Sequence, residues 1–221
     1  MSTATQSRET VLAAVRAATS GVACAPARLA EACQAVPRPY DHAGTLDREA
    51  RLALLVARLR EYGAEVVSTT PAALPAAIAA QLKATGKRRF AAPEGLPAEW
   101  LDAGFEWRVD RELPTAEIEH CDGVLTAASA AIADSGTIVL HHGPREGRRL
   151  LSLLPDTHVC VLLASQVVET LPEYFQRCLA PPALVTWISG PSATADIEMT
   201  RIKGVHGPRF LHVVLVLDQP S

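Results

Sequence analysis

The sequence predicts an α/β fold built around a parallel sheet, and two observations support this prediction. Helical and strand patterns alternate from residue 46 to about residue 110, as they do in chains of βαβ units. The segment THVCVLLA (157–164) is apolar almost throughout, which is typical of a strand covered on both faces of a sheet.

The first part of the chain is set apart from this alternation. Residues 8–19 form an amphipathic pattern with Val11, Leu12 and Val15 on one helical face. Residues 20–45 are rich in proline and glycine, and they predict a linker or extended arm. We therefore expect an N-terminal helix and arm over residues 1–45 and one α/β domain over residues 46–221.

The alternating elements follow in a regular order, and Gly63 and Gly86 end two of the helices. Helices are predicted over 46–63, 71–86 and 96–104, and strands over 64–70, 87–93 and 105–110. Two strands are expected within 123–142, a short helix within 143–155, strands over 157–164, 183–189 and 210–217, and a helix over 165–179 opened by Ser165 as N-cap.

Composition excludes several classes of protein. Of the 221 residues, 48% are hydrophobic, which is enough for a substantial core, and the net charge is −3. A basic stripe is lacking, so we expect no nucleic-acid partner. The chain has no run of eighteen apolar residues and no signal-peptide pattern, so we expect a cytoplasmic protein without a membrane span.

The five cysteines lie far apart, without a CxxC spacing. This argues against an intrinsic iron–sulfur cluster and favours reduced, mostly buried thiols. The candidate metal ligands are His141, His142, His158, Cys160 and His206. They form no HExxH motif and no spaced pair on a helix, so no metal site and no intrinsic cofactor are predicted.

The segment SGPSATADIEMTRIKGVHGP (189–208) is the first candidate for ligand binding. A glycine turn leads from a strand into a helical pattern over 194–202, and a helix N-terminus presents free N–H groups to an anion. Gly190, Pro191, Ser192 and Thr194 are therefore candidate ligand contacts. Simple helix capping is the alternative.

Two further residues of this segment are candidates with an alternative role. Asp196 lies where it suits the helix dipole, so its role is divided between helix stabilisation and the site. His206, between Gly204 and Gly207, is either an acid/base or anion-binding group, or a histidine that bonds its own turn.

Two other loops carry candidate anion-binding groups. Ser135, Gly136 and Thr137 follow Asp134 in a tight turn whose N–H groups can form an anion nest, with an ordinary hairpin turn as the alternative. Arg148 and Arg149 suit bidentate recognition of phosphate or carboxylate, and a solvated charged loop explains them equally well.

Thr126 is a further candidate ligand contact, because it lies near the end of a predicted strand. Strand ends near residues 126, 135 and 189 would converge on one edge of a parallel sheet, which would gather the candidate ligand contacts in one place.

Three segments in this order resemble the lactate-utilization protein C group of the LUD-domain family. They are AIADSGTIVL (131–140), RRLLSLLPDTHVCVL (148–162) and SGPSATADIEMTRIKGVHGPRFLHVVLV (189–216). The resemblance covers roughly residues 46–217. It implies a three-layer α/β/α fold with a mostly parallel sheet, related to the ribose-5-phosphate isomerase and CoA-transferase superfamily.

The resemblance also implies a function. The family's role is the use of L-lactate by an iron–sulfur-containing system that oxidises it to pyruvate, with the cluster in larger partner subunits. CoA transferases use a glutamate nucleophile, and Asp134 is its nearest analogue here, which makes it the candidate catalytic residue.

Three functions are thus open at the level of sequence. The first is an accessory subunit of a lactate-oxidising system that binds a small anionic or phosphorylated ligand. The second is a stand-alone enzyme acting on a phosphorylated metabolite or CoA ester. The third is an interaction scaffold, in which residues 1–45 would dock a partner or a second copy to give a homodimer.

Overall fold

The computed structural model describes residues 3–19, 26–194, 202–203 and 207–218. The chain divides into two compact units, Met1–Tyr40 and Asp41–Ser221. The first unit holds α1 (Thr3–Thr19) and α2 (Pro26–Ala35). Residues 26–35 are thus helical where the sequence predicted a linker or extended arm.

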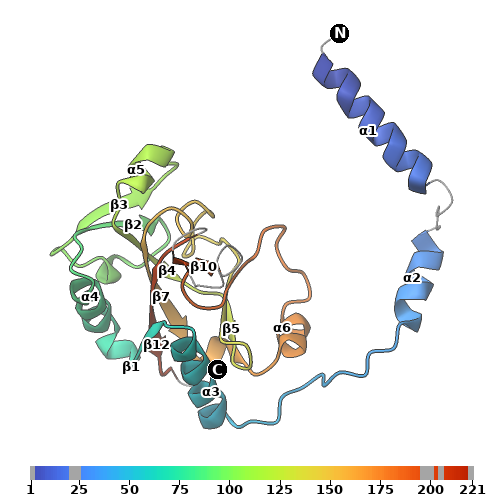
Figure 1. Cartoon of the computed structure of the whole chain (residues 1–221). Coiled ribbons are helices and arrows are strands. Elements are labelled where there is room, and N and C mark those ends of the chain that lie inside the picture. Colours follow the sequence, from blue (N-terminus) through green and yellow to red (C-terminus); the bar gives the residue numbers. More distant parts are fainter. Residues whose placement is uncertain (1–2, 20–25, 195–201, 204–206, 219–221) are drawn as a thin grey trace. The chain divides into compact units, whose positions relative to one another are not determined.

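A parallel sheet forms the centre of the second unit (Figure 1). Its six strands lie in the order β1-β12-β7-β4-β2-β3, and every neighbouring pair is parallel. The strands are β1 (Glu65–Thr69), β2 (Arg89–Pro93), β3 (Glu106–Asp110), β4 (Gly123–Ala127), β7 (Thr157–Leu163) and β12 (Phe210–Val216).

A second, smaller sheet has the order β8-β5-β6-β9, with β5 antiparallel to β6 and β6 antiparallel to β9. Its strands are β5 (Ala130–Ile132), β6 (Thr137–Leu140), β8 (Val167–Val168) and β9 (Thr186–Ile188). A short antiparallel pair joins β10 (Ala193–Thr194) and β11 (Ile202–Lys203).

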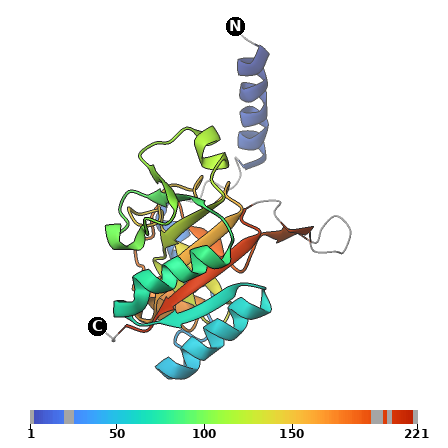
Figure 2. The same cartoon turned by 90° about the vertical axis from the view of Figure 1, so that its left-hand side faces the viewer.

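The helices of the second unit are short. They are α3 (Arg48–Glu61), α4 (Leu74–Ala84), α5 (Thr115–Glu119) and α6 (Leu171–Arg177), with 3₁₀ turns η1 (Pro71–Ala73), η2 (Ala98–Trp100) and η3 (Ala164–Gln166). Figure 2 looks onto the face of the central sheet that α4 crosses.

The core lies on both faces of the central sheet because side chains alternate along each strand. Val159 and Val161 of β7 pack with α4 and η2 on one face. Cys160 and Leu162 pack with α3 and the small sheet on the other face. The predicted α/β class with a mostly parallel sheet is confirmed. The layer on one face of the central sheet contains both α3 and the small sheet.

Some predicted helices were wrong. The segment 143–155, where a short helix was predicted, forms turns at 144–146 and 149–153, and the helical pattern over 165–179 splits into η3, β8 and the shorter α6. Val167 and Val168 pair with β5, and this long-range ladder overrides the local helical preference. Residues 194 and 202, the ends of another predicted helix, lie in β10 and β11, and residues 195–201 between them are outside the described residues.

Thr170, not Ser165, is the N-cap of α6. The Glu173 N–H donates to the Thr170 hydroxyl at 3.4 Å, and the Glu173 carboxylate accepts from the Thr170 N–H at 3.2 Å, which is a capping box. Ser165 instead donates its hydroxyl and its N–H to the carboxylate of Asp218.

Glu173 also fixes the start of the second unit. Its carboxylate accepts from the N–H of Gly44 at 2.8 Å and from that of Glu169 at 2.7 Å, while Glu169 accepts from the Leu46 N–H at 2.6 Å. Burial alone would raise the pKa of Glu173, but the N–H donors of Gly44, Glu169 and Thr170 hold that pKa below its ordinary value.

The capping box gives a stability prediction. Thr170→Ala removes the side-chain acceptor and should lower the free energy of unfolding by about 1 kcal/mol, measured by urea denaturation. Thr170→Ser keeps the hydroxyl and is the matched control, which should stay near the parent. Equal losses in the two variants would contradict this assignment of the cap.

Candidate functional site

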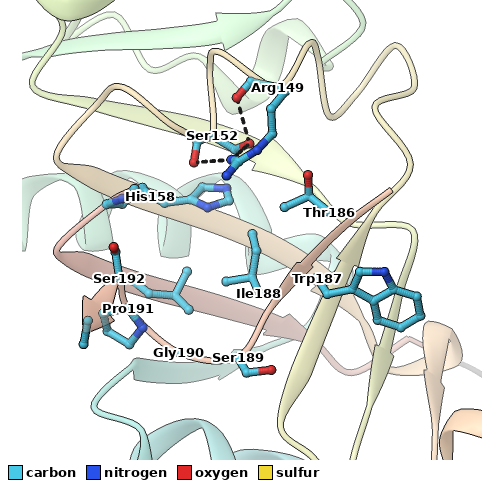
Figure 3. Close-up of a pocket in the computed structure, with 14 residues that line it drawn as sticks. Arg149, Ser152, His158, Thr186, Trp187, Ile188, Ser189, Gly190, Pro191 and Ser192 are labelled. Carbon is cyan, nitrogen blue, oxygen red and sulfur yellow. Dashed lines mark hydrogen bonds between the residues drawn. The ribbon is translucent and has the colours of Figure 1, made fainter. Parts of the chain in front are cut away.

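A cavity of about 230 Å³ opens at the amino ends of β7 and β12, where both strands face the segment after β9. We call it the amino-edge cavity. Figure 3 shows Arg149 and His158 on one side and Gly190 to Ser192 on the other. Its lining residues are Arg149, Ser152, His158, Thr186, Trp187, Ile188, Ser189, Gly190, Pro191, Ser192, Ala193, Gly207, Pro208 and Leu211.

Arg149 supplies positive charge to the amino-edge cavity. One guanidinium nitrogen, Nη1, donates to the carbonyl and the hydroxyl of Ser152, both at 3.0 Å. Within the part of the chain that the structure describes, no carboxylate lies within 4.0 Å of Arg149. Burial lowers its pKa from the ordinary value. A partly buried cation without a carboxylate partner favours an anionic ligand.

His158 is fully buried beside this arginine. Its Nε2 lies 2.8 Å from the hydroxyl of Thr126, and its Nδ1 has no hydrogen-bond partner among the described residues. Burial, and then the charge of Arg149, lower the pKa of His158 to about 4. The imidazole is therefore neutral at neutral pH and retains one unused polar atom.

The opposite wall is held by a glycine. Gly190 has φ of +82°, and a Cβ there would lie 2.5 Å from the Cβ of Tyr62, just beyond the end of α3. A side chain at this position would meet both a strained backbone and a clash. The Ser192 N–H donates to the carbonyl of Pro208 at 2.8 Å, which ties the two loops of the cavity together.

A row of hydroxyl groups connects the small sheet to the cavity. The hydroxyl of Thr137 lies 2.7 Å from that of Ser135 and 2.7 Å from that of Ser189, which lines the cavity. The turn that was a candidate anion nest therefore supports the wall of the cavity through Thr137.

The structure separates nine of the twelve candidate ligand contacts into three groups. Four line the amino-edge cavity, two touch its lining residues, and three lie elsewhere. The lining residues are Arg149, Gly190, Pro191 and Ser192, the supporting residues are Thr126 and Thr137, and Ser135, Gly136 and Arg148 lie outside the lining. Asp196 and His206 fall outside the described residues, as does the side chain of Thr194.

Arg148 differs from its neighbour Arg149. Its guanidinium binds the carboxylate of Asp110 through two hydrogen bonds of 2.8 and 2.9 Å, and it also donates to the carbonyl of Leu113. The Asp110 side chain is only 5% exposed. Burial alone would raise the pKa of Asp110, but the hydrogen bonds from Arg148 and from backbone N–H groups keep that pKa below its ordinary value. Arg148 thus stabilises a buried carboxylate of β3.

The candidate catalytic residue is also placed away from this cavity. Asp134 is exposed, and its carbonyl oxygen accepts a hydrogen bond from Nε of Arg58 at 3.2 Å. It is not among the residues that line the amino-edge cavity. A nucleophilic role for Asp134 therefore remains a prediction from the resemblance.

Ser152, His158 and Gly207 line the cavity but were not selected as ligand contacts from the sequence. A usable signal existed for His158, because it is the one histidine within the otherwise apolar strand predicted over 157–164. A histidine in a strand that is buried on both faces needs polar partners there.

Within residues 3–19, 26–194, 202–203 and 207–218, no group of three or more His, Cys, Asp or Glu side chains is arranged to hold a metal ion. His141 lies 2.7 Å from the Tyr174 hydroxyl, and His142 bonds Gly147 and Thr186. Within the same ranges, none of the helices combines the length and apolar character that a bilayer crossing requires.

The buried histidine predicts a pH dependence of stability. In the unfolded chain His158 takes up a proton near pH 6.5, whereas in the folded chain it does so at about pH 4. Stability should therefore fall as pH drops through this window, by a total on the order of 3 kcal/mol from this group. His158→Gln, which retains a polar partner for Thr126, should show a shallower loss in urea denaturation at pH 7, 5.5 and 4.5. Equal slopes in parent and variant would contradict the shifted pKa.

Comparisons with known proteins agree on one family. The model of the LUD domain matches residues 47–216. The chain is 43% identical over 188 residues to a protein of Deinococcus radiodurans named Lactate utilization protein C, covering 83% of this chain and 87% of that protein. A Bacillus velezensis protein of the same name is 33% identical, over 55% of this chain and 54% of that one.

A solved structure agrees with the fold. The crystal structure of a DUF162 family protein from Deinococcus radiodurans matches with a TM-score of 0.66 and 38% identity, covering 78% of this chain and all of that chain. The family match spans the central sheet and the lining of the amino-edge cavity. The chain belongs to the LUD-domain family.

Proposed function

We propose that this chain takes part in lactate utilization, as a subunit of an iron–sulfur-dependent system that oxidises L-lactate to pyruvate. The observation that carries the proposal is the 43% identity, over most of both chains, to a protein named Lactate utilization protein C. Relatives from Bacillus and Exiguobacterium carry the same name and support the same role.

The cluster of such a system would belong to a partner subunit. Cys121 and Cys160 are buried in different core clusters, and burial raises the pKa of the Cys160 thiol to about 12. Iron–sulfur clusters are held by several thiolates that lie close together, and a thiol with so high a pKa is a poor source of one. Within this proposal, the present chain contributes a ligand site.

The ligand that fits the amino-edge cavity is a small anion. Arg149 offers the charge, and in the tautomer whose Nε2 accepts from the Thr126 hydroxyl the neutral His158 offers its Nδ1–H as one further donor. A phosphate or a carboxylate would satisfy both groups. The second candidate function, a stand-alone enzyme acting on a phosphorylated metabolite or CoA ester, uses the same cavity and is favoured by the same Arg149.

Gene disruption tests the proposed role. Loss of the gene should abolish growth on L-lactate as sole carbon source and leave growth on pyruvate intact, because only the oxidation step is removed. The measurement is the growth rate on each carbon source, in a host without another lactate dehydrogenase and with a complemented strain as control. Normal growth of the disrupted strain on L-lactate would refute the role.

The amino-edge cavity gives a prediction with matched arginines. Arg149→Ala should weaken the binding of phosphate or of a small carboxylate by about tenfold or more, because a charged hydrogen-bond donor is lost. Arg148→Ala should instead lower the free energy of unfolding, since it leaves the buried Asp110 without its cation.

Isothermal titration calorimetry and thermal denaturation separate these two effects. Arg111→Ala, which breaks an exposed ion pair with Glu94, removes the same charge from the surface and should change neither quantity appreciably. Unchanged anion affinity in folded Arg149→Ala would show that the ligand does not bind in this cavity.

A further inference from the structure

A second cavity, of about 470 Å³, lies at the opposite edge of the central sheet, and we call it the carboxyl-edge cavity. Ala127 ends β4 and Leu163 ends β7, while Gly95 follows the end of β2. Its lining residues are Gly95, Trp100, Ala127, Ala128, Ser129, Gly143, Pro144, Arg145, Glu146, Val161, Leu163 and Gln166.

The chain topology opens a crevice at this place. After β2 the chain passes through η2, on the sheet face that α4 covers, and continues to β3, which lies beside β2 in the sheet. After β4 it passes through β5, on the opposite face, and later continues to β7, which lies beside β4 on the side away from β2. Neighbouring parallel strands whose connections diverge in this way leave a crevice beyond their carboxyl ends, and ligands of open α/β sheets bind there.

The loop 143–147 borders the crevice and is held by backbone contacts on both sides. The Gly95 N–H donates to the carbonyl of Pro144 at 3.0 Å, and the Ala127 N–H donates to that of Arg145 at 2.9 Å. A Cβ at Gly95 would lie 2.5 Å from the Pro144 carbonyl oxygen, so only glycine permits this approach. The loop is thereby fixed, and so are the two charged residues that it carries.

These two residues present opposite charges without an ion-pair partner. Glu146 is only 5% exposed, and its carboxylate accepts hydrogen bonds from the Ser129 hydroxyl and the His141 N–H. Arg145 is exposed. Among the described side chains, no cation lies within 4.0 Å of Glu146 and no carboxylate within 4.0 Å of Arg145. A buried carboxylate with only neutral donors is costly unless a further donor reaches it.

We propose that the carboxyl-edge cavity is a second ligand site, which binds a small carboxylate that also carries a hydrogen-bond donor. Arg145 pairs with the carboxylate of the ligand, and Glu146 accepts its donor group. Val161 and Leu163 offer an apolar surface to the carbon chain between them. The geometry alone fits a hydroxyl or an ammonium donor, and the choice of a 2-hydroxy acid rests on the proposed function.

L-Lactate and pyruvate form a matched pair of probes for this site. Both carry the carboxylate that Arg145 requires, but only lactate has the hydroxyl donor, and the keto oxygen of pyruvate would face the carboxylate of Glu146. The full chain, labelled with ¹⁵N, is titrated with each acid by NMR. Lactate should bind more tightly than pyruvate, with amide shifts at residues 127–129, 143 and 145–147.

Two variants divide the contributions. Arg145→Ala should weaken both acids by about tenfold, because the charged donor serves the group that they share. Glu146→Gln is isosteric and should weaken lactate by about tenfold, because the charged acceptor of its hydroxyl is lost, while pyruvate should bind as tightly as before or more tightly, because the amide can donate to the keto oxygen. Arg209→Ala, which removes an exposed partner of Asp156 near the amino ends of the strands, is the charge control and should bind both acids as the parent does.

The outcomes separate this site from the proposed function. Absence of lactate binding, shifts confined to the amino-edge cavity, or unchanged affinities in Arg145→Ala would each overturn the second site. Arg145 is exposed and without an ion-pair partner among the described residues, so its variant should fold even if Glu146→Gln does not. Loss of growth on L-lactate after gene disruption would still support the proposed function if the second site were refuted.

Discussion

The parallel ladder of β7 is the constraint on which the rest of the domain depends. This strand pairs with β12 along its whole length, from Thr157 to Leu163, and with β4 on its other side. Neighbouring strands form hydrogen bonds with both edges of β7, and helices or strands cover both of its faces. The side chains of β7 are therefore fixed in alternation on the two faces. His158 near its start faces one cavity, and Leu163 at its end faces the other.

The two ends of the central sheet consequently present different chemistry. At the amino ends, a positive guanidinium lies beside a neutral imidazole, and loops of low side-chain volume complete the wall. At the carboxyl ends, charges of both signs lie above an apolar floor. Between them, the hydroxyl of Thr126 contacts both His158, at 2.8 Å, and Cys160, at 3.9 Å, so one buried face of the sheet carries polar groups from one end towards the other.

Sequence patterns predicted the elements whose stability is largely local or whose burial is complete. The periodic pattern of α3, the apolar runs of β7 and β12 and the glycine stops after α3 and α4 are all readable without tertiary information. The segment of β8 was not readable in this way, because Val167 and Val168 become a strand only by pairing with β5.

The candidate site also shows the difference between what a local sequence pattern predicts and what long-range contacts decide. Arg148 and Arg149 are adjacent and chemically identical, yet one binds Asp110 and the other faces a cavity. The difference depends on a carboxylate 38 residues away, which a local pattern does not reveal. The sequence predicts Gly136 and Gly190 as ligand contacts within their loops. In the structure both lie close to α3 or its end, Gly136 beside Arg58 and Gly190 beside Tyr62.

The attachment at Glu173 has a mechanical consequence. The backbone at Gly44 and Leu46 is held by the carboxylates of Glu173 and Glu169, and those two residues adjoin the N-terminus of α6 and the end of β8. A force applied to the chain before Gly44 would act first on these two carboxylates. From there it would reach the small sheet, whose far strand β9 leads into the wall of the amino-edge cavity.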